Sequence, residues 1–266
     1  MSASREDILK EIGLWPQWRR RDAPADEPVA VVEDAPELQA AVVQSARERA
    51  PAPAAAVISA APSLPLVARV TQISDMGWPQ LKQCVADCSA CQLHKGRNKT
   101  VFGVGDEQAD WMFVGEGPGA DEDMKGDPFV GQAGKLLDSM LAAIKLKRGE
   151  KVYITNVVKC RPPNNRNPEA GEVEQCEPYL HRQIELIRPK LIVALGKVAA
   201  VNLLKREASV TSMRGKVHDY RGIPMIVTYH PAYLLRTLPE KARAWEDMCF
   251  AVETMQGLQS GASAPI

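Results

Sequence analysis

Four of the six cysteines have the spacing of a metal-binding site. Cys88 and Cys91 form a Cys-x-x-Cys pair, and Cys160 and Cys176 form a second pair separated by residues 161–175. Four thiolates can hold a zinc ion tetrahedrally or bind an iron–sulfur cluster, and spacing alone does not separate the two. A lone pair could be a redox motif, but two pairs favour a metal. The other two cysteines are interpreted as ordinary small apolar residues.

A glycine-rich turn followed by acidic side chains is a second candidate for chemistry. The apolar run Trp111–Val114 is typical of a buried strand, and the turn Gly115–Gly119 follows it directly as GEGPG. Glycines here let the backbone come close to a ligand. Five candidate site residues lie in or soon after the turn: Glu116, Gly117, Glu122, Asp123 and Phe129. The alternative is a surface loop that happens to be rich in glycine and aspartate.

Strands and helices alternate along the chain and position these residues. Runs typical of strands lie at 111–116, 152–158, 191–195 and 225–229, and helical patterns lie at about 131–146, 169–187, 197–205 and 239–255. This alternation predicts an α/β fold, a three-layer α/β/α sandwich with a central parallel four-stranded sheet. Unusual segments follow the four strands: GEGPG, NVVKCRPP, LGK and YHPAYLLR. Parallel strands end at one edge of a sheet, so these loops are expected to share one site.

Composition sets limits on the class of protein. The chain has 33 Lys and Arg and 33 Asp and Glu, so bulk charge offers no argument for nucleic acid. No apolar run approaches the roughly 18 residues of a membrane span, and the N-terminus has no signal-peptide layout. We therefore expect a cytoplasmic protein, in which cysteines favour metal binding over disulfides.

The N-terminal region differs in composition from the rest of the chain. It is rich in Ala, Pro and Val, and residues 22–38 carry six acids and no Lys or Arg. Such a composition cannot bury a core. We predict a short docking-type segment at 1–21, a flexible linker at 22–76, the folded domain at 77–256 and a disordered tail at 257–266.

The motifs taken together resemble family 4 uracil-DNA glycosylases, the iron–sulfur branch of that superfamily. The resemblance covers roughly residues 85–255 and rests on GEGPGADED, PFVGQAGKLLD, YITNVVKCRPPNNR, HPAYLLR and the four cysteines at their spacing. It implies a 4Fe-4S cluster on Cys88, Cys91, Cys160 and Cys176. It also implies removal of uracil from single- or double-stranded DNA by a monomeric, nucleoid-associated repair enzyme.

The resemblance also implies roles for individual side chains. Asn156 matches the asparagine that reads uracil, because an amide offers a donor and an acceptor to the base edge. Phe129 matches the aromatic residue that stacks on the base, and His230 matches the residue that hydrogen-bonds uracil O2. The alternatives are a strand-end cap for Asn156, plain core for Phe129 and a structural histidine for His230.

The residue that positions the water nucleophile is less directly implied. Another uracil-DNA glycosylase family carries an Asp where this chain has Gly117, so the role must move to another acid. Glu122 is our first choice, followed by Asp123 and Glu116. Most acids in such a loop are solvated, which is the competing interpretation.

Further residues are candidates for holding the DNA strand. Gly131–Gly134, at a helix start, could hold a phosphate. Leu234 and Leu235 could fill the gap left by a flipped base. The predicted substrate-binding set is therefore Gly117, Phe129, Asn156, Gly131, Gln132, Leu234, Leu235 and Arg236. Predicted phosphate contacts are Lys95, Arg97, Lys99, Arg161 and Arg166.

Two other functions compete with a glycosylase. One is a uracil-DNA binding protein that traps its substrate without turnover; a related subgroup does this with a histidine in an inserted loop. The loop RPPNNRNPEAG here contains no histidine. The other is an iron–sulfur nucleotide-binding module, which gives no reason for Asn156 or His230.

The N-terminal segment is not explained by the glycosylase resemblance. Residues 5–21 carry Ile8, Ile12, Trp15 and Trp18 and end in three arginines. A short helix cannot bury two tryptophans alone. The pattern loosely resembles the N-terminal peptide of the psi subunit of the bacterial replicative clamp loader, which implies docking on that loader. The alternatives are contact with the glycosylase domain or with DNA.

Overall fold

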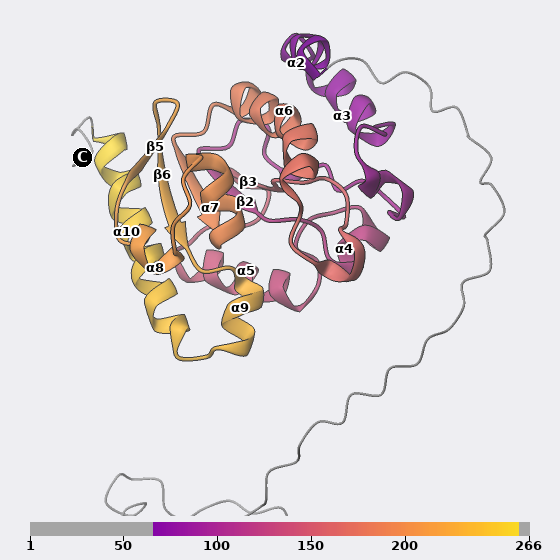
Figure 1. Cartoon of the computed structure of the whole chain (residues 1–266). Coiled ribbons are helices and arrows are strands. Elements are labelled where there is room, and N and C mark those ends of the chain that lie inside the picture. The colour runs from indigo at the N-terminus through magenta and orange to yellow at the C-terminus, as the bar shows by residue number, and fades with distance from the viewer. Residues whose placement is uncertain (1–65, 261–266) are drawn as a thin grey trace, which may run out of the picture. The chain divides into compact units, whose positions relative to one another are not determined.

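The four predicted strands form the parallel centre of a six-stranded sheet. A computed structural model describes residues 66–260 and gives the strand order β1-β3-β2-β4-β6-β5 (Figure 1). Each central strand is an apolar run of the kind that both faces of a parallel sheet bury. The strands are β1 Val104–Gly105, β2 Trp111–Gly115, β3 Val152–Asn156, β4 Leu191–Leu195, β5 His218–Tyr220 and β6 Ile223–Thr228. The α/β fold class is confirmed.

The prediction of a four-stranded sheet was wrong at both edges. Strand β1 pairs antiparallel with β3, and β5 pairs antiparallel with β6. Both edge strands are too short to show the alternation that identifies a strand in a sequence. They become part of the sheet only because each pairs with a neighbouring central strand.

Helices cover both faces of the sheet. The helices are α2 Leu66–Ser74, α3 Trp78–Ala86, α4 Ala120–Lys125, α5 Gln132–Ala143, α6 Ala170–Ile187, α7 Lys197–Leu204, α8 Val210–Met213, α9 Pro231–Arg236 and α10 Glu240–Gln259. Two single 3-10 turns lie at Gln92–Lys95 and Pro163–Asn165. The four long helical patterns in the sequence correspond to α5, α6, α7 and α10 within a few residues at each end, except that α10 runs four residues past the predicted 255.

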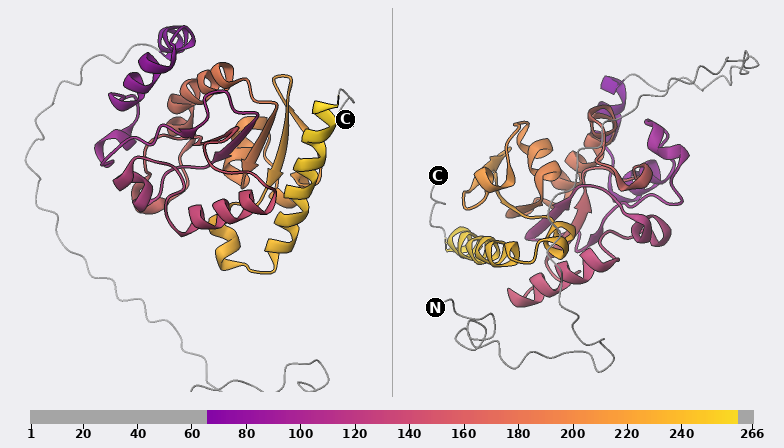
Figure 2. Two further views of the ribbon diagram at one scale, coloured as in Figure 1. Left: turned by 180° about the vertical axis from the view of Figure 1, so that it is seen from behind. Right: turned by 60° about the horizontal axis from the view of Figure 1, so that its bottom comes forward.

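Successive side chains of each strand point to opposite faces of the sheet and pack into two hydrophobic cores. Met112 and Val114 of β2 face one core, which α3, α6 and α7 complete. Trp111 and Phe113 face the other, which α5 and α10 complete. Figures 1 and 2 show α10, in yellow, running alongside the sheet. This two-sided burial fixes the strand register, and with it the positions at which the strands end.

The predicted linker, 22–76, ends too late in the chain. Helix α2 occupies residues 66–74, which we predicted as linker, and it contacts α6. Arg69 donates a 2.7 Å hydrogen bond to Gln175 Oε1, and its guanidinium lies 5.1 Å from the centre of the Tyr179 ring. The predicted segment 1–21 and the rest of the linker lie outside the described residues. Within the described part, no helix is long and apolar enough to cross a membrane.

Candidate active site

The ends of the four parallel strands surround one cavity. Gly115 of β2 is paired with Asn156 of β3, and Leu195 of β4 with Thr228 of β6, so the residues that follow lie at one edge of the sheet. A cavity of about 630 Å³ opens there, and its lining includes Glu116, Asn156, Gly196 and His230. The predicted convergence of the loops is present in the structure.

Asn156 presents an unpaired amide oxygen to this site. Its side chain is 2% exposed, and among the described residues its Oδ1 atom has no hydrogen-bond partner. Buried polar atoms without a partner are uncommon, and they are a reason to look for a ligand. A Cβ atom at Gly115 would lie 2.4 Å from Asn156 Oδ1 and 2.6 Å from Phe129 Cζ. Glycine at this strand end therefore makes room for both side chains.

Phe129 is held in an unusual backbone conformation beside Asn156. Its φ is 55°, a region that bulky residues rarely adopt. The Arg148 guanidinium holds this turn by donating to the carbonyl oxygens of Pro128 at 2.8 Å and Phe129 at 2.9 Å. A Cβ at Gly134 would lie 1.8 Å from the Phe129 carbonyl oxygen, so this helix position also requires glycine. The ring is thereby fixed as one wall of the cavity.

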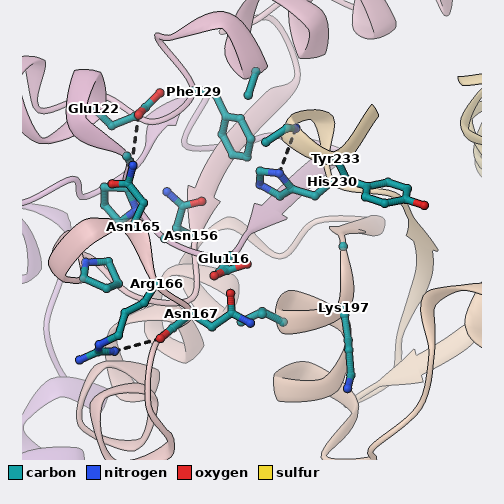
Figure 3. Close-up of a pocket in the computed structure, with 18 of the residues that line it drawn as sticks. Glu116, Glu122, Phe129, Asn156, Asn165, Arg166, Asn167, Lys197, His230 and Tyr233 are labelled. Carbon is teal, nitrogen blue, oxygen red and sulfur yellow. Dashed lines mark hydrogen bonds between the residues drawn. The ribbon is translucent and has the colours of Figure 1, made fainter. Parts of the chain in front are cut away.

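His230 faces Phe129 across the cavity and is neutral. The two ring centres are 5.5 Å apart (Figure 3). Burial, with a smaller contribution from Arg236, lowers the pKa of His230 to about 4. The backbone N–H of Ala232 donates to His230 Nδ1 at 3.2 Å, which caps helix α9. Because Nδ1 accepts this hydrogen bond, the proton of the neutral ring is on Nε2, which is left as a donor.

The three candidate carboxylates have different surroundings. The Glu122 carboxylate accepts hydrogen bonds from the N–H groups of Gly119, Val130 and Gly131 at 2.8–3.1 Å, so it ties the glycine turn to the start of α5. Glu116 lines the cavity, and no donor among the described residues contacts its carboxylate. Burial raises the pKa of the Glu116 carboxyl above its ordinary value. Glu116 is thus the acid with free oxygens.

Asp123 does not reach the cavity. Its side chain is fully buried, and its Oδ1 atom accepts a 2.9 Å hydrogen bond from the Asn98 backbone N–H. The carboxylate fixes the loop that precedes β1. Its prediction as a catalytic acid conflicts with this placement, because burial leaves the carboxylate no route to a bound water.

Several predicted substrate contacts lie away from the cavity. Leu234 is 1% exposed and packs with Tyr229 and Ala244, so it cannot act as a wedge. Leu235 is 41% exposed and remains available. The N–H of Gly131 is occupied by Glu122, and neither Gly131 nor Gln132 lines the cavity. Predicted positions that do line it are Glu116, Gly117, Glu122, Phe129, Asn156, Arg166, His230 and Arg236.

Three predicted phosphate contacts are already engaged within the protein. Arg97 donates to Cys160 Sγ at 3.0 Å, Arg161 donates to Asn165 Oδ1 at 2.7 Å, and Arg166 pairs with Glu172. Other residues that line the cavity were not predicted as site residues: Asn165, Asn167, Lys197, Tyr229 and Tyr233. Lys197 and Tyr229 lie in the strand-end segments LGK and YHPAYLLR, so position after a strand was the signal that could have identified them.

The four predicted cysteine ligands line one small cavity. Cys88, Cys91, Cys160 and Cys176 approach it from the segment after α3, the segment after β3 and helix α6. All are free thiols. Burial raises the pKa of Cys91 and Cys160, and it raises the pKa of Cys176 to about 12. Thiols whose pKa values are raised in this way ionise together only beside a strong positive charge, as a bound metal provides.

The donor set around this cavity is one that metal centres use. Four thiols enclose the same small space, and four thiolates hold either a zinc ion or an iron–sulfur cluster. Among residues 66–260, no group of three or more His, Cys, Asp or Glu side chains is already placed to hold a metal ion. The chemistry of the residues therefore fits a metal centre and does not by itself choose between the two.

Comparisons with known proteins agree with this fold. Residues 102–249 match the uracil DNA glycosylase superfamily, which defines the class of protein. A type-4 uracil-DNA glycosylase of Archaeoglobus fulgidus is 52% identical over 159 residues, which cover 57% of this chain and 79% of that protein. One from Thermotoga maritima is 46% identical over 161 residues, covering 60% and 83%. The chain belongs to the type-4 uracil-DNA glycosylases.

Proposed function

We propose that this protein removes uracil from DNA by hydrolysing the N-glycosidic bond, which releases free uracil and leaves an abasic site. The observation that carries this is the buried Asn156 Oδ1, which has no partner among residues 66–260 and shares one cavity with a fixed aromatic ring and a neutral histidine donor. A base within a duplex cannot reach such a cavity, so the nucleotide must flip out of the stack.

Each of the three side chains contacts a different part of the base. The Asn156 amide can pair with the N3–H and O4 edge of uracil and so distinguish it from cytosine. Phe129 stacks on the ring face. His230 Nε2–H donates to O2, where negative charge develops as the bond to N1 breaks. The placement of the three groups around one cavity supports these roles.

Glu116 is our choice for the residue that activates water. The water oxygen forms a bond to C1′ as the N1–C1′ bond breaks, and the electron pair of that bond leaves with N1 to give the uracil anion. Glu116 accepts the proton from the water, and the anion takes a proton from solvent. This choice replaces Glu122, because backbone N–H groups already occupy the Glu122 carboxylate.

Replacing Glu116 with glutamine should lower the single-turnover rate by roughly 10²-fold, which is the scale of a lost general base. Because burial raises the pKa of Glu116, the reactive carboxylate forms only as the pH rises above the ordinary value of 4.5. The wild-type rate should therefore climb with pH through an acid limb that the glutamine variant lacks. Glu150→Gln, at an exposed ion pair with Lys147, is the matched control. A Glu116→Gln variant that keeps the wild-type single-turnover rate and its acid limb would exclude Glu116 as the base.

The whole function is tested by a multiple-turnover assay on uracil-containing oligonucleotides. Free uracil in excess of enzyme supports the proposal. A covalent protein–DNA adduct would point to a trapping protein, and neither product would point to a binding module. Single-stranded and double-stranded substrates in parallel give the strand preference.

We also infer that the four cysteines hold a 4Fe-4S cluster. The cluster would be structural here, since the cysteines join α6 to the segments that follow α3 and β3. When bound, it would supply the positive charge that four neighbouring thiolates, two of them buried, require. The Arg97 guanidinium, at 3.0 Å from Cys160 Sγ, would help to stabilise the thiolate.

The N-terminal segment is our proposed docking element for the replicative clamp loader. The support is its sequence alone, two tryptophans followed by three arginines within residues 5–21. Deleting residues 1–25 should leave uracil release from short oligonucleotides unchanged, because the active-site cavity is built from residues after 115. The same deletion should abolish co-purification with the clamp loader. A deletion that cripples the oligonucleotide assay, or an isolated peptide that binds no replication protein, contradicts the docking proposal.

A further inference from the structure

A buried lysine lies between the predicted uracil-reading residue and the cysteine cavity. Lys159 is 1% exposed, although lysine is rarely buried unless it is paired. Its ammonium donates to Thr155 Oγ1 at 2.6 Å, to Gln183 Oε1 at 2.7 Å and to the Asn156 carbonyl oxygen at 2.8 Å. All three protons are used, and nothing in the catalytic scheme above involves this group.

The acceptors of Lys159 belong to a closed network. Thr155 Oγ1 and Gln183 Nε2 both donate to the Phe102 carbonyl oxygen, at 3.0 and 2.9 Å. Gln183 Nε2 also lies 3.2 Å from the Tyr153 hydroxyl. A buried polar network stabilises one arrangement only when its members are satisfied. Here the Lys159 ammonium, the Thr155 hydroxyl and the Gln183 amide each have an acceptor. The network therefore fixes β3, α6 and the segment before β1 relative to one another.

The backbone of Lys159 is held as firmly as its side chain. Its N–H donates to Cys176 Sγ at 3.2 Å, and its carbonyl oxygen accepts from the Val101 N–H at 2.8 Å. The next residue is Cys160, so the main chain here belongs to the wall of the cysteine cavity. One residue thus contacts both the cysteines and the backbone of Asn156.

The carbonyl group that accepts a hydrogen bond from Lys159 belongs to the last residue of strand β3. Asn156 ends β3, and the next two N–H groups, of Val157 and Val158, donate to the carbonyl oxygens of Gly115 and Glu116. The Asn156 carbonyl receives the Lys159 ammonium as its partner. Fixing this peptide fixes the direction in which the Asn156 side chain leaves the strand.

We propose that Lys159 is a positioning residue that sets the orientation of Asn156 and makes base recognition depend on the integrity of the cysteine site. This rests on the proposed function of Asn156 in binding uracil. Lys159 touches no substrate; it acts through the Asn156 peptide. The lysine is retained in the core because apolar side chains cannot bind a carbonyl oxygen.

The test uses direct binding of free uracil, which does not depend on turnover. Lys159→Met should weaken uracil binding by about 10- to 100-fold, the scale of a small misplacement of a binding group. In an Asn156→Ala background the same change should alter uracil affinity by no more than about twofold, because the group through which it acts is gone. Iron per chain, measured on the same samples, reports the cysteine site separately.

Two further variants keep the test decisive. Gln183→Met removes one acceptor at similar size and should weaken uracil binding in the same direction, and it decides the matter if Lys159→Met is insoluble. Lys190→Met removes an ammonium that pairs with Asp110 at 2.9 Å and lines neither the active-site cavity nor the cysteine cavity, so this variant should bind uracil as the wild type does. Wild-type uracil affinity in both Lys159→Met and Gln183→Met overturns the inference. Wild-type protein that neither binds nor releases uracil instead refutes the proposed function.

Discussion

Replacing His230 with alanine should lower single-turnover uracil release by roughly 10²–10³-fold while DNA binding persists, the scale of one lost oxyanion donor. The reason is the fixed tautomer: Ala232 N–H occupies Nδ1, so Nε2–H is directed to the cavity. Single-turnover release and DNA affinity, measured on one oligonucleotide, separate the two effects. His218→Ala, on the edge strand β5, is the control and should release uracil at the wild-type rate.

The same variant should change how stability depends on pH. Folding lowers the pKa of His230 from 6.5 to about 4, so between these values the unfolded chain binds the proton more readily. The free energy of unfolding therefore rises with pH through this window and falls on acidification. The alanine variant should lack this contribution in denaturant titrations at pH 4–6.5. Near-wild-type uracil release by His230→Ala would refute the catalytic role.

Replacing Cys176 with alanine should abolish iron binding and yield little soluble protein. Cys176 lies within α6, is 7% exposed and accepts the Lys159 N–H, so its loss disconnects that helix from the segment after β3. Buried metal ligands contribute directly to folding free energy. Iron content and visible absorbance after anaerobic purification are the measurements.

Cys249→Ala is the matched control for this prediction. Cys249 lies on α10, away from the cysteine cavity, and its replacement should preserve both iron and solubility. Stoichiometric zinc without iron, in protein never exposed to oxygen, would contradict the cluster. A soluble Cys176→Ala protein with full iron would remove Cys176 from the ligand set.

The central part of the fold could be predicted because its signals are local. Each of β2, β3, β4 and β6 is an apolar run, and the longer helices between them, α5, α6 and α7, bury apolar residues against the sheet, so alternation alone implied a parallel sheet. Parallel strands end at one edge, which is why Asn156 and His230 could be expected to share a site. The edge strands β1 and β5 carry no such pattern and depend on pairing with a neighbour.

The roles of the acids could not be ranked from the sequence. Glu122 and Asp123 are adjacent in the chain, yet one carboxylate ties two turns together and the other is buried against Asn98. Which way an acid points depends on the three-dimensional path of the loop. Leu234 and Leu235 differ in the same way, because a helix turns adjacent side chains to different faces. Such neighbours differ in burial, and a helix of six residues is too short for its hydrophobic periodicity to show which of them is buried.

The partnerless oxygen of Asn156 also determines how the proposed site would tell uracil from cytosine. Among residues 66–260 no donor reaches Oδ1, so its donor must come from solvent when no base is bound and from the base when one is. Uracil offers N3–H in place of that water, whereas cytosine offers an acceptor at N3 and would leave Oδ1 without a donor, at a cost of about 1–3 kcal/mol. On this scheme discrimination comes from the penalty on the wrong base and not from an unusually strong bond to the right one.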